Sequence, residues 1–340
     1  MLYVTTRDNS NPHTAYRAIH DQRNSDGGFY VPFRHPQFDK TEIDELCQLP
    51  FGKCVSQILN RLLNTRLTQW DIDFHCGRNP VLLKNLAHKT FVAEAWHSRS
   101  ESFEGTIRGI TELVSEDSGA VSDWLDIAVR AAMWFGIFGD LKGMGIEQAD
   151  VSVVSGDFRV PMSAWYARHW GLPIGEILCC CNENNSIWEL LSHGQMRTDM
   201  VNISTVVPEA DVSVPVQLER LVYEAGGIEE TGRYLDAVRH GRSYHPCDMV
   251  WTKLRRGMYP AVISSRRLAD TIPSVYRTNG YRMTPATALA YAGAQDYRAK
   301  TGQTSPVVIW AEENPCSKFD TVSSYGIGDG AQDNCGRTDV

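Results

Sequence analysis

The segment Trp96–Gly105, WHSRSESFEG, gathers side chains that could do chemistry within ten residues. His97 and Glu104 supply an imidazole and a carboxylate, groups that act as general acids and bases. Arg99 supplies a guanidinium, which can bind an anion through paired hydrogen bonds. The segment contains no lysine, so it has no amine that could form an imine with a carbonyl compound.

Metal binding is a second chemistry that these residue types allow. His97 and Glu101 would share one face if the segment were helical, and His245–Cys247, HPC, offers soft ligands. Neither group completes the four-ligand pattern of a zinc site. The run Cys179–Cys181 lies within an apolar stretch, where cysteine behaves as a small hydrophobic residue. We therefore predict no metal site, and core packing for the three cysteines.

Composition and charge describe an ordinary globular chain that does not bind nucleic acid. The 340 residues carry 33 Lys+Arg against 41 Asp+Glu, a net charge of −8. Without a basic stripe, a nucleic acid or an anionic membrane surface is not an expected partner. The first ten residues resemble no signal peptide, and the nine cysteines show no regular spacing. The sequence predicts a cytoplasmic location and reduced thiols.

The elements that must position these residues follow a strand and helix pattern. Helical spacing is predicted on both sides of Pro50, two short strands lie within residues 81–96, and a buried helix spans Ser122–Leu141. An apolar strand at Val151–Val154, a helix at Ser163–Trp170 and a strand at Ile177–Cys181 form one strand–helix–strand unit. Such a unit implies a parallel sheet.

The remaining part of the chain continues this pattern. Helices are predicted at Gln217–Ala225, at Glu229–His240 and on either side of Pro273, and an Ala-rich helix begins near Thr284. A strand follows at Ser305–Glu313. The last twenty residues are rich in Gly, Ser and Asp and predict a loose tail.

Several stretches, in order, resemble the threonine synthase family of fold-type II enzymes, which use pyridoxal phosphate (PLP). DGGFYVP is similar to the family's GL(F/Y)-P segment, and the stretch from VVSGDFRVP to LLSHGQ is similar to its (S/T)GNFG…TN.ND region. PEADVSVPVQLERLVYE, TPATALAY and AEENPCSKF match three further motifs. The resemblance runs from Leu2 to about Asp320 and implies a three-layer α/β fold with a parallel sheet, like the family's large domain.

The resemblance also implies a domain organisation. Residues 1–80 would form an N-terminal segment of helices and strands, 81–320 the large α/β domain, and 321–340 a flexible tail. In the family, a small domain follows the lysine-bearing helix. Here FEGTIRGITELV runs through a short acidic turn, Ser115–Ala120, into the buried helix. We therefore predict that the small domain is missing.

The family's catalytic lysine has no counterpart. Its motif ELFHGPTLAFKD aligns with EAWHSRSESFEG, so that His97 matches a histidine, Phe103 a phenylalanine and Glu104 the lysine. A carboxylate cannot form the aldimine, and it reverses the charge beside an anionic cofactor. We predict that PLP is absent.

The other cofactor contacts change as well. The phosphate loop SGNFG appears as SGDFR, in which Asp157 adds a negative charge and Arg159 replaces a glycine. Glu312 or Glu313 stands where a threonine faces the pyridine ring. The residues that the resemblance assigns to ligand or anion binding are Ser155, Gly156, Asp157, Phe158, Arg159, Arg99, Glu312 and Asn314.

Three hypotheses follow for function. In the first, the chain is a pseudoenzyme with a binding or protein-partner role, in which a homodimer or another protein covers surface left by the missing domain. In the second, it is a PLP-independent enzyme acting on a small amino-acid-like or phosphorylated substrate, with Glu104 and His97 as catalytic residues and Arg159 as anion clamp. In the third, PLP chemistry persists through Lys84 or Lys89.

Overall fold

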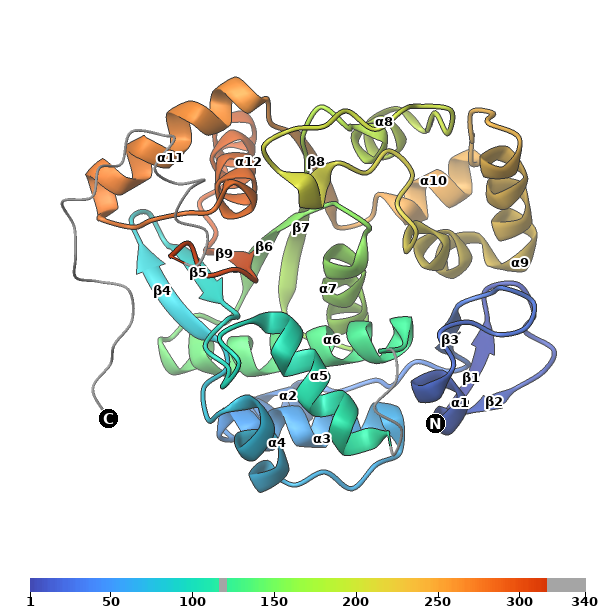
Figure 1. Cartoon of the computed structure of the whole chain (residues 1–340), viewed down its shortest axis with the longest axis horizontal. Coiled ribbons are helices and arrows are strands. Elements are labelled where there is room, and N and C mark those ends of the chain that lie inside the picture. The colour runs from blue at the N-terminus through green and yellow to red at the C-terminus, as the bar shows by residue number, and fades with distance from the viewer. Residues whose placement is uncertain (116–120, 317–340) are drawn as a thin grey trace.

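A six-stranded sheet forms the centre of the molecule, and helices cover both of its faces (Figure 1). The computed structural model describes residues 1–115 and 121–316. The strand order is β4-β5-β9-β6-β7-β8, with bounds Leu82–Leu86 (β4), Thr90–Glu94 (β5), Ala149–Val154 (β6), Ile174–Cys181 (β7), Met258–Val262 (β8) and Val307–Ala311 (β9). Neighbouring strands are parallel except β4, which is antiparallel to β5. The predicted α/β fold with a parallel sheet is confirmed.

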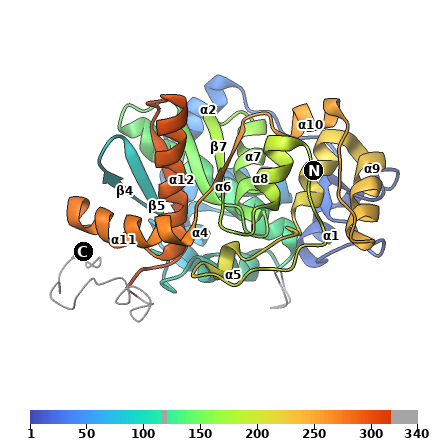
Figure 2. The same ribbon diagram turned by 90° about the horizontal axis from the view of Figure 1, so that it is seen from above.

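The helices form two outer layers. One face of the sheet carries α12 (Pro285–Thr301) with α11 (Ser265–Asn279) against it, and the other carries α6 (Asp123–Gly143) and α7 (Arg159–His169). The other helices are α1 (Ala15–His20), α2 (Lys40–Cys47), α3 (Phe51–Leu63), α4 (Gln69–Cys76), α5 (Phe103–Val114), α8 (Ser186–His193), α9 (Leu218–Arg239) and α10 (Asp248–Leu254). In Figure 2, α11 and α12 lie at one end of the molecule and α9 and α10 at the other.

Strand β7 contributes side chains to the hydrophobic cores on both faces of the sheet. Its side chains alternate, so Cys179 and Cys181 enter the core beneath α6 and α7, while Cys180 enters the core beneath α12. All three thiols are at most 1% exposed. Burial raises the pKa of Cys180 to about 12, because it disfavours the charged thiolate. The cysteines are core residues, as predicted.

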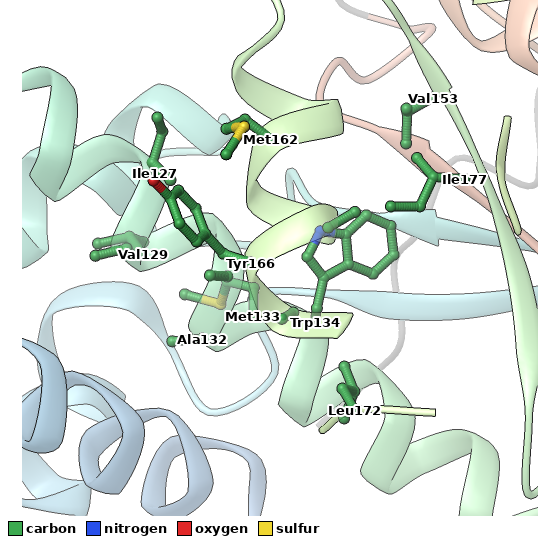
Figure 3. Packing of buried hydrophobic residues seen from close by; sticks show 14 of the residues in the cluster. Ile127, Val129, Ala132, Met133, Trp134, Val153, Met162, Tyr166, Leu172 and Ile177 are labelled. Carbon is green, nitrogen blue, oxygen red and sulfur yellow. The ribbon is translucent and has the colours of Figure 1, made fainter. Parts of the chain in front are cut away.

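Helix α6 is the central packing element of the other layer. Ser122 caps it by accepting a hydrogen bond from the backbone N–H of Leu125 at 3.1 Å. Figure 3 shows Trp134 of α6 among buried side chains of α7 and the sheet. Its indole N–H donates to Ser163 Oγ at 3.2 Å, which satisfies the one polar atom that this side chain buries.

The N-terminal segment forms its own small sheet, which packs against helices α6 and α9. Its strands are β1 (Leu2–Thr5), β2 (His13–Thr14) and β3 (Tyr30–Pro32), in the order β2-β1-β3. Glu219 of α9 accepts hydrogen bonds from Arg7 and from Thr6. The Tyr3 ring meets the Trp124 ring edge-on at 5.2 Å. Residues distant in sequence therefore join the small sheet to the helices α6 and α9.

Several elements differ from the predictions. The helix around Pro273 is continuous, because α11 runs through the proline. The two helices predicted between Gln217 and His240 form one element, α9, whose axis breaks at Gly227, where φ is +70°. Strand β8 was not predicted, because its run MYPAV contains a proline.

Two predictions concern segments that lie wholly or mostly outside the residues that the structure describes. The predicted tail, 321–340, and most of the predicted turn Ser115–Ala120 lie outside the described residues. Helix α5 ends at Val114 and α6 begins at Asp123, so residues 115–122 alone separate them. Of the cysteines within the described residues, seven are free thiols, whereas Cys316 is disulfide-bonded. The expectation of reduced thiols throughout is therefore wrong at that residue.

Candidate functional site

The carboxyl ends of the parallel strands meet at one edge of the sheet, and the predicted site segments follow them. Residues 95–102 follow β5, 155–158 follow β6, and 312–316 follow β9. The register Val151↔Val308 and Ala93↔Trp310 brings the last two loops and the first to the same edge. Open α/β sheets bind ligands at this edge, where the strand order reverses. The predicted site segments therefore lie together at the carboxyl edge of the sheet.

Glu104 does not face this site. Ser102 caps α5, and the first turn buries Phe103 while it leaves the Glu104 side chain 84% exposed. The carboxylate lies 3.2 Å from Arg108, one turn further along the helix. A surface pair of this kind contributes at most a few tenths of a kcal/mol. The residue aligned with the family's lysine is therefore a solvated surface carboxylate.

His97 is tied to a carboxylate that the sequence did not single out. Its Nε2 lies 2.8 Å from Glu94 Oε2, and Tyr281 donates its hydroxyl to Glu94 Oε1 at 2.8 Å. Burial and the charge of Glu94 raise the pKa of Tyr281 well above its ordinary value, so the phenol stays protonated. Arg99 lies apart from both, exposed, with its guanidinium 5.0 Å from the centre of the Phe74 ring.

Arg159 is held by three carboxylates. Its Nη2 lies 3.0 Å from Asp123, its Nη1 lies 3.8 Å from Asp126, and its Nε lies 3.3 Å from Asp157. Burial acts to lower the pKa of Arg159, but the three negative charges outweigh it and the pKa is raised. The guanidinium is therefore already neutralised by the protein itself.

Arg130, which the sequence did not single out, lies next to this group. Its Nε donates to Asp126 at 2.7 Å, its Nη1 contacts Glu312, and its guanidinium lies 4.4 Å from the centre of the Phe103 ring. Trp310 donates its indole N–H to the same Glu312 oxygen at 2.6 Å. Burial raises the pKa of Glu312, and the Arg130 charge only partly offsets this.

We call this group the edge cluster. It joins two arginines to four carboxylates, so its formal charge is −2 and would still be −1 with one carboxyl protonated. Its members are Asp123, Asp126, Arg130, Asp157, Arg159 and Glu312. The signal for it was present in the sequence, since Asp126 and Arg130 are charged residues four apart within the otherwise apolar run 124–139 of α6.

The loop SGDFR forms a turn in which a side chain of the loop accepts a hydrogen bond from the loop's own backbone. The N–H of Arg159, at the first position of α7, donates to Asp157 Oδ1 at 3.0 Å. Gly156 has φ +42°, and an added Cβ would lie 2.6 Å from the carbonyl oxygen of Glu209. Ser155 contacts Cys181 Sγ at 3.2 Å, and the buried Phe158 takes φ +75°. The helix N-terminus that could bind an anion is thus occupied by a carboxylate of the loop.

Neighbouring loops complete the edge. Asn182 donates to Asp211 at 2.6 Å and to Thr205 at 2.8 Å, which fastens residues 203–211 over the end of β7. Asn314 accepts a hydrogen bond from the backbone N–H of Cys316 at 2.9 Å and so shapes the turn after β9. Among the described residues, no group of three His, Cys, Asp or Glu side chains could hold a metal ion.

Comparisons with known proteins agree with this fold. Residues 2–78 match the family described as the threonine synthase N terminus. The threonine synthase of Pseudomonas aeruginosa is 26% identical over 227 residues, which cover 66% of this chain and 47% of that protein. Human threonine synthase-like 1 is 25% identical over 194 residues, which cover 55% of this chain and 24% of that protein. The chain thus matches less than half the length of these curated relatives.

Solved structures show the same relation. The crystal structure of PLP-bound threonine synthase from Brucella melitensis has a TM-score of 0.82 at 17% identity and covers 96% of this chain and 91% of that one. Threonine synthase from yeast has a TM-score of 0.85 at 14% identity and covers 97% and 91%. In sequence the chain is similar to threonine synthase and threonine synthase-like proteins, and its fold is similar to that of solved threonine synthases.

Proposed function

We propose that this threonine-synthase-like protein does not carry out PLP chemistry and serves instead as a binding or partner protein. The observation that carries the proposal is the edge cluster, because the phosphate-binding turn is filled by Asp157 and by an arginine already paired with three carboxylates. Position 104 adds to this argument, since its carboxylate faces solvent.

The residues at the edge do not fit PLP. A phosphate group carries close to two negative charges at neutral pH, and the edge cluster presents a formal charge of −2. The negative charge of the phosphate and the net negative charge of the edge cluster would repel each other. To place the phosphate at the helix N-terminus, Asp157 would have to leave the Arg159 N–H, and that hydrogen bond would be lost. No step of a reaction is therefore derived through this cofactor.

The two lysines that could replace the missing one are placed unfavourably. Lys84 is exposed in the middle of β4, where it pairs with Val92. Lys89 precedes β5, so it lies at the amino edge of the sheet, opposite the site, and its carbonyl accepts from Val307 there. Both positions argue against a cofactor imine at the carboxyl edge.

The PLP-independent enzyme remains the alternative hypothesis. It requires Glu104 and Arg159 to act on one substrate, whereas the first faces solvent and the second is neutralised. The pair His97–Glu94 is better suited to move a proton, because the carboxylate holds the imidazole at 2.8 Å. A substrate-dependent rate that disappears in His97→Gln would favour this alternative.

The proposal is tested by titration with PLP. We expect no visible aldimine absorption after addition and dialysis, and no change on borohydride treatment, because no amine is available at position 104. The threonine synthase of Pseudomonas aeruginosa serves as positive control. A visible band that borohydride abolishes, with the label on a lysine of this chain, would refute the proposal.

A second prediction concerns the partner. The loop between α8 and α9 exposes four apolar side chains, although Asn182 and Asn184 fasten it over the sheet edge. Their exposed fractions are 84% for Val201, 49% for Ile203, 41% for Val206 and 47% for Val216. Several exposed apolar side chains on one loop are typical of an interface. We propose that a second copy of the chain covers these side chains.

Sedimentation velocity tests the homodimer. We expect a dimer at tens of micromolar protein and a monomer for the double variant Val201→Asp/Ile203→Asp, because a buried charge opposes association. Met144→Asp, at another exposed apolar residue, is the matched control and should stay dimeric. A monomeric wild-type protein would exclude self-association as the role of these side chains.

No helix in the described part of the chain is long and apolar enough to cross a membrane. The cytoplasmic location and a role in amino-acid metabolism remain proposals.

A further inference from the structure

A cavity of about 390 Å³ is lined by residues of α9 and α10. These helices lie at the opposite end of the molecule from α11 and α12 (Figure 2). The cavity lies between the segment after β3, the break in α9, and α10. The lining side chains that matter here are Phe33, His35, Tyr223, Glu224, Met249 and Lys253. His35 contacts Trp170, at the opposite end of α7 from Arg159, so helix geometry separates the two sites by roughly 15 Å.

One wall of this cavity holds a carboxylate, Glu224, with no Lys or Arg side chain of the described residues in direct contact, although the charge of the buried Arg220, one turn earlier in α9, acts on it. Glu224 Oε2 lies 2.9 Å from His35 Nε2, and Glu224 Oε1 accepts the Tyr166 hydroxyl at 3.0 Å. Burial and the Glu224 charge raise the pKa of Tyr166 well above its ordinary value, so this donor is neutral. In the part of the chain that the structure describes, no Lys or Arg nitrogen lies within 4.0 Å of the carboxylate.

The tautomer of His35 follows from its other neighbour. The Trp170 indole can only donate, and its Nε1 lies 3.3 Å from His35 Nδ1, so Nδ1 accepts. The proton of the neutral ring must then lie on Nε2, facing Glu224. Two neutral donors therefore hold Glu224 in place, and its side chain remains 10% exposed, on the cavity wall.

The other wall carries the opposite charge. Lys253 lies in the last turn of α10 and is exposed, and within the described residues its ammonium has no carboxylate within 4.0 Å. At the break in α9, a Cβ added to Gly227 would meet no atom within 4 Å, so the backbone there borders open space. Phe33, Tyr223 and Met249 supply apolar surface between the charges.

We propose that this cavity binds a free α-amino acid, with its ammonium group at Glu224, its carboxylate at Lys253 and its side chain against Phe33, Tyr223 and Met249. A simple cation would be repelled by the lysine and a simple anion by the glutamate, whereas a zwitterion matches both. The volume lies within the usual range for small-molecule sites. The site does not depend on the state of the carboxyl edge, so it stands apart from the proposed loss of PLP chemistry.

The test uses the full chain and isothermal titration calorimetry. The probes are L-leucine, L-methionine and L-phenylalanine, each compared with its N-acetyl and carboxamide derivatives. We expect saturable binding of at least one free amino acid. Either derivative should bind at least tenfold more weakly, which corresponds to about 1.4 kcal/mol, because each removes one charge of the zwitterion.

Two variants test whether the ligand binds at Glu224 and Lys253. Glu224→Gln and Lys253→Met should each weaken binding at least tenfold. The matched controls are Glu229→Gln, an exposed carboxylate beyond the break in α9, and Lys300→Met, an exposed lysine in the last turn of α12, and both should bind as the wild type. If Glu224→Gln does not fold, Lys253→Met decides alone, because its side chain lies in solvent.

Two results would overturn the proposal. The first is no saturable binding of any of the three amino acids up to about 10 mM. The second is binding that Lys253→Met leaves unchanged. Neither result bears on the PLP titration, so the two proposals fail independently.

Discussion

Replacement of Arg130 by methionine is expected to lower the free energy of unfolding by about 3 kcal/mol. The guanidinium is 9% exposed and joins Asp126 to Glu312, so its removal leaves two carboxylates close together without their shared cation. Loss of one partner from a buried ion pair costs about 3–5 kcal/mol, and Glu312 is 31% exposed, which favours the lower value. Urea denaturation followed by circular dichroism measures the loss.

Arg108→Met is the control for this change. It removes an arginine from an i,i+4 pair with Glu104, but both side chains are mostly exposed, so we expect a loss of about 0.5 kcal/mol or less. Equal losses in the two variants would show that the edge cluster does not stabilise the fold.

The loss in free energy of unfolding caused by Arg130→Met, called the deficit below, should depend on pH. Glu312 has a raised pKa in the folded state, so it takes up a proton at higher pH when folded than when unfolded. Stability from such a group is present at low pH and is lost as pH rises through the folded pKa. Without Arg130 that pKa rises further, and we expect a smaller deficit at about pH 5 than at about pH 8. An unchanged deficit would mean that Glu312 does not titrate in this range.

Replacement of Trp310 by alanine is the second large effect. We expect a loss of about 3–5 kcal/mol, because the indole is 5% exposed and its removal leaves a cavity in the sheet. The ring packs 4.8 Å from Trp134 and 5.2 Å edge-on from Phe103, and its N–H donates to Glu312. One side chain thus links the core beneath α6 to the edge cluster.

Trp70→Ala is the matched control, since Trp70 is 66% exposed on α4 and should cost about 0.5 kcal/mol or less. Trp310→Phe separates the two contributions of the indole. It keeps most of the packing and removes the N–H, so it should recover most but not all of the loss. A full recovery would show that the hydrogen bond to Glu312 contributes nothing.

Much of the fold was predictable because its signals are local. The apolar runs at Val151–Val154 and Ile177–Cys181, with a helix between them, required a parallel pair, and the register Val151↔Ile177 agrees with this. The cap at Ser122 and the N-terminal Thr284 of α12 were visible as residue types. Strand β8 gave no such signal, since its run contains Pro260, and it forms by pairing with β7.

The candidate site was predictable only in part. By itself, the sequence determined which residue types stand in the segments that follow the strands, including the carboxylate at Glu104 and the arginine at Arg159. Tertiary structure decided that Glu104 turns outward while Phe103 turns inward, and that Arg130 of α6 meets Glu312 across 182 residues of sequence. Periodicity and spacing report contacts between near neighbours, whereas the charge of a site depends on which distant side chains packing brings within a few ångströms of each other.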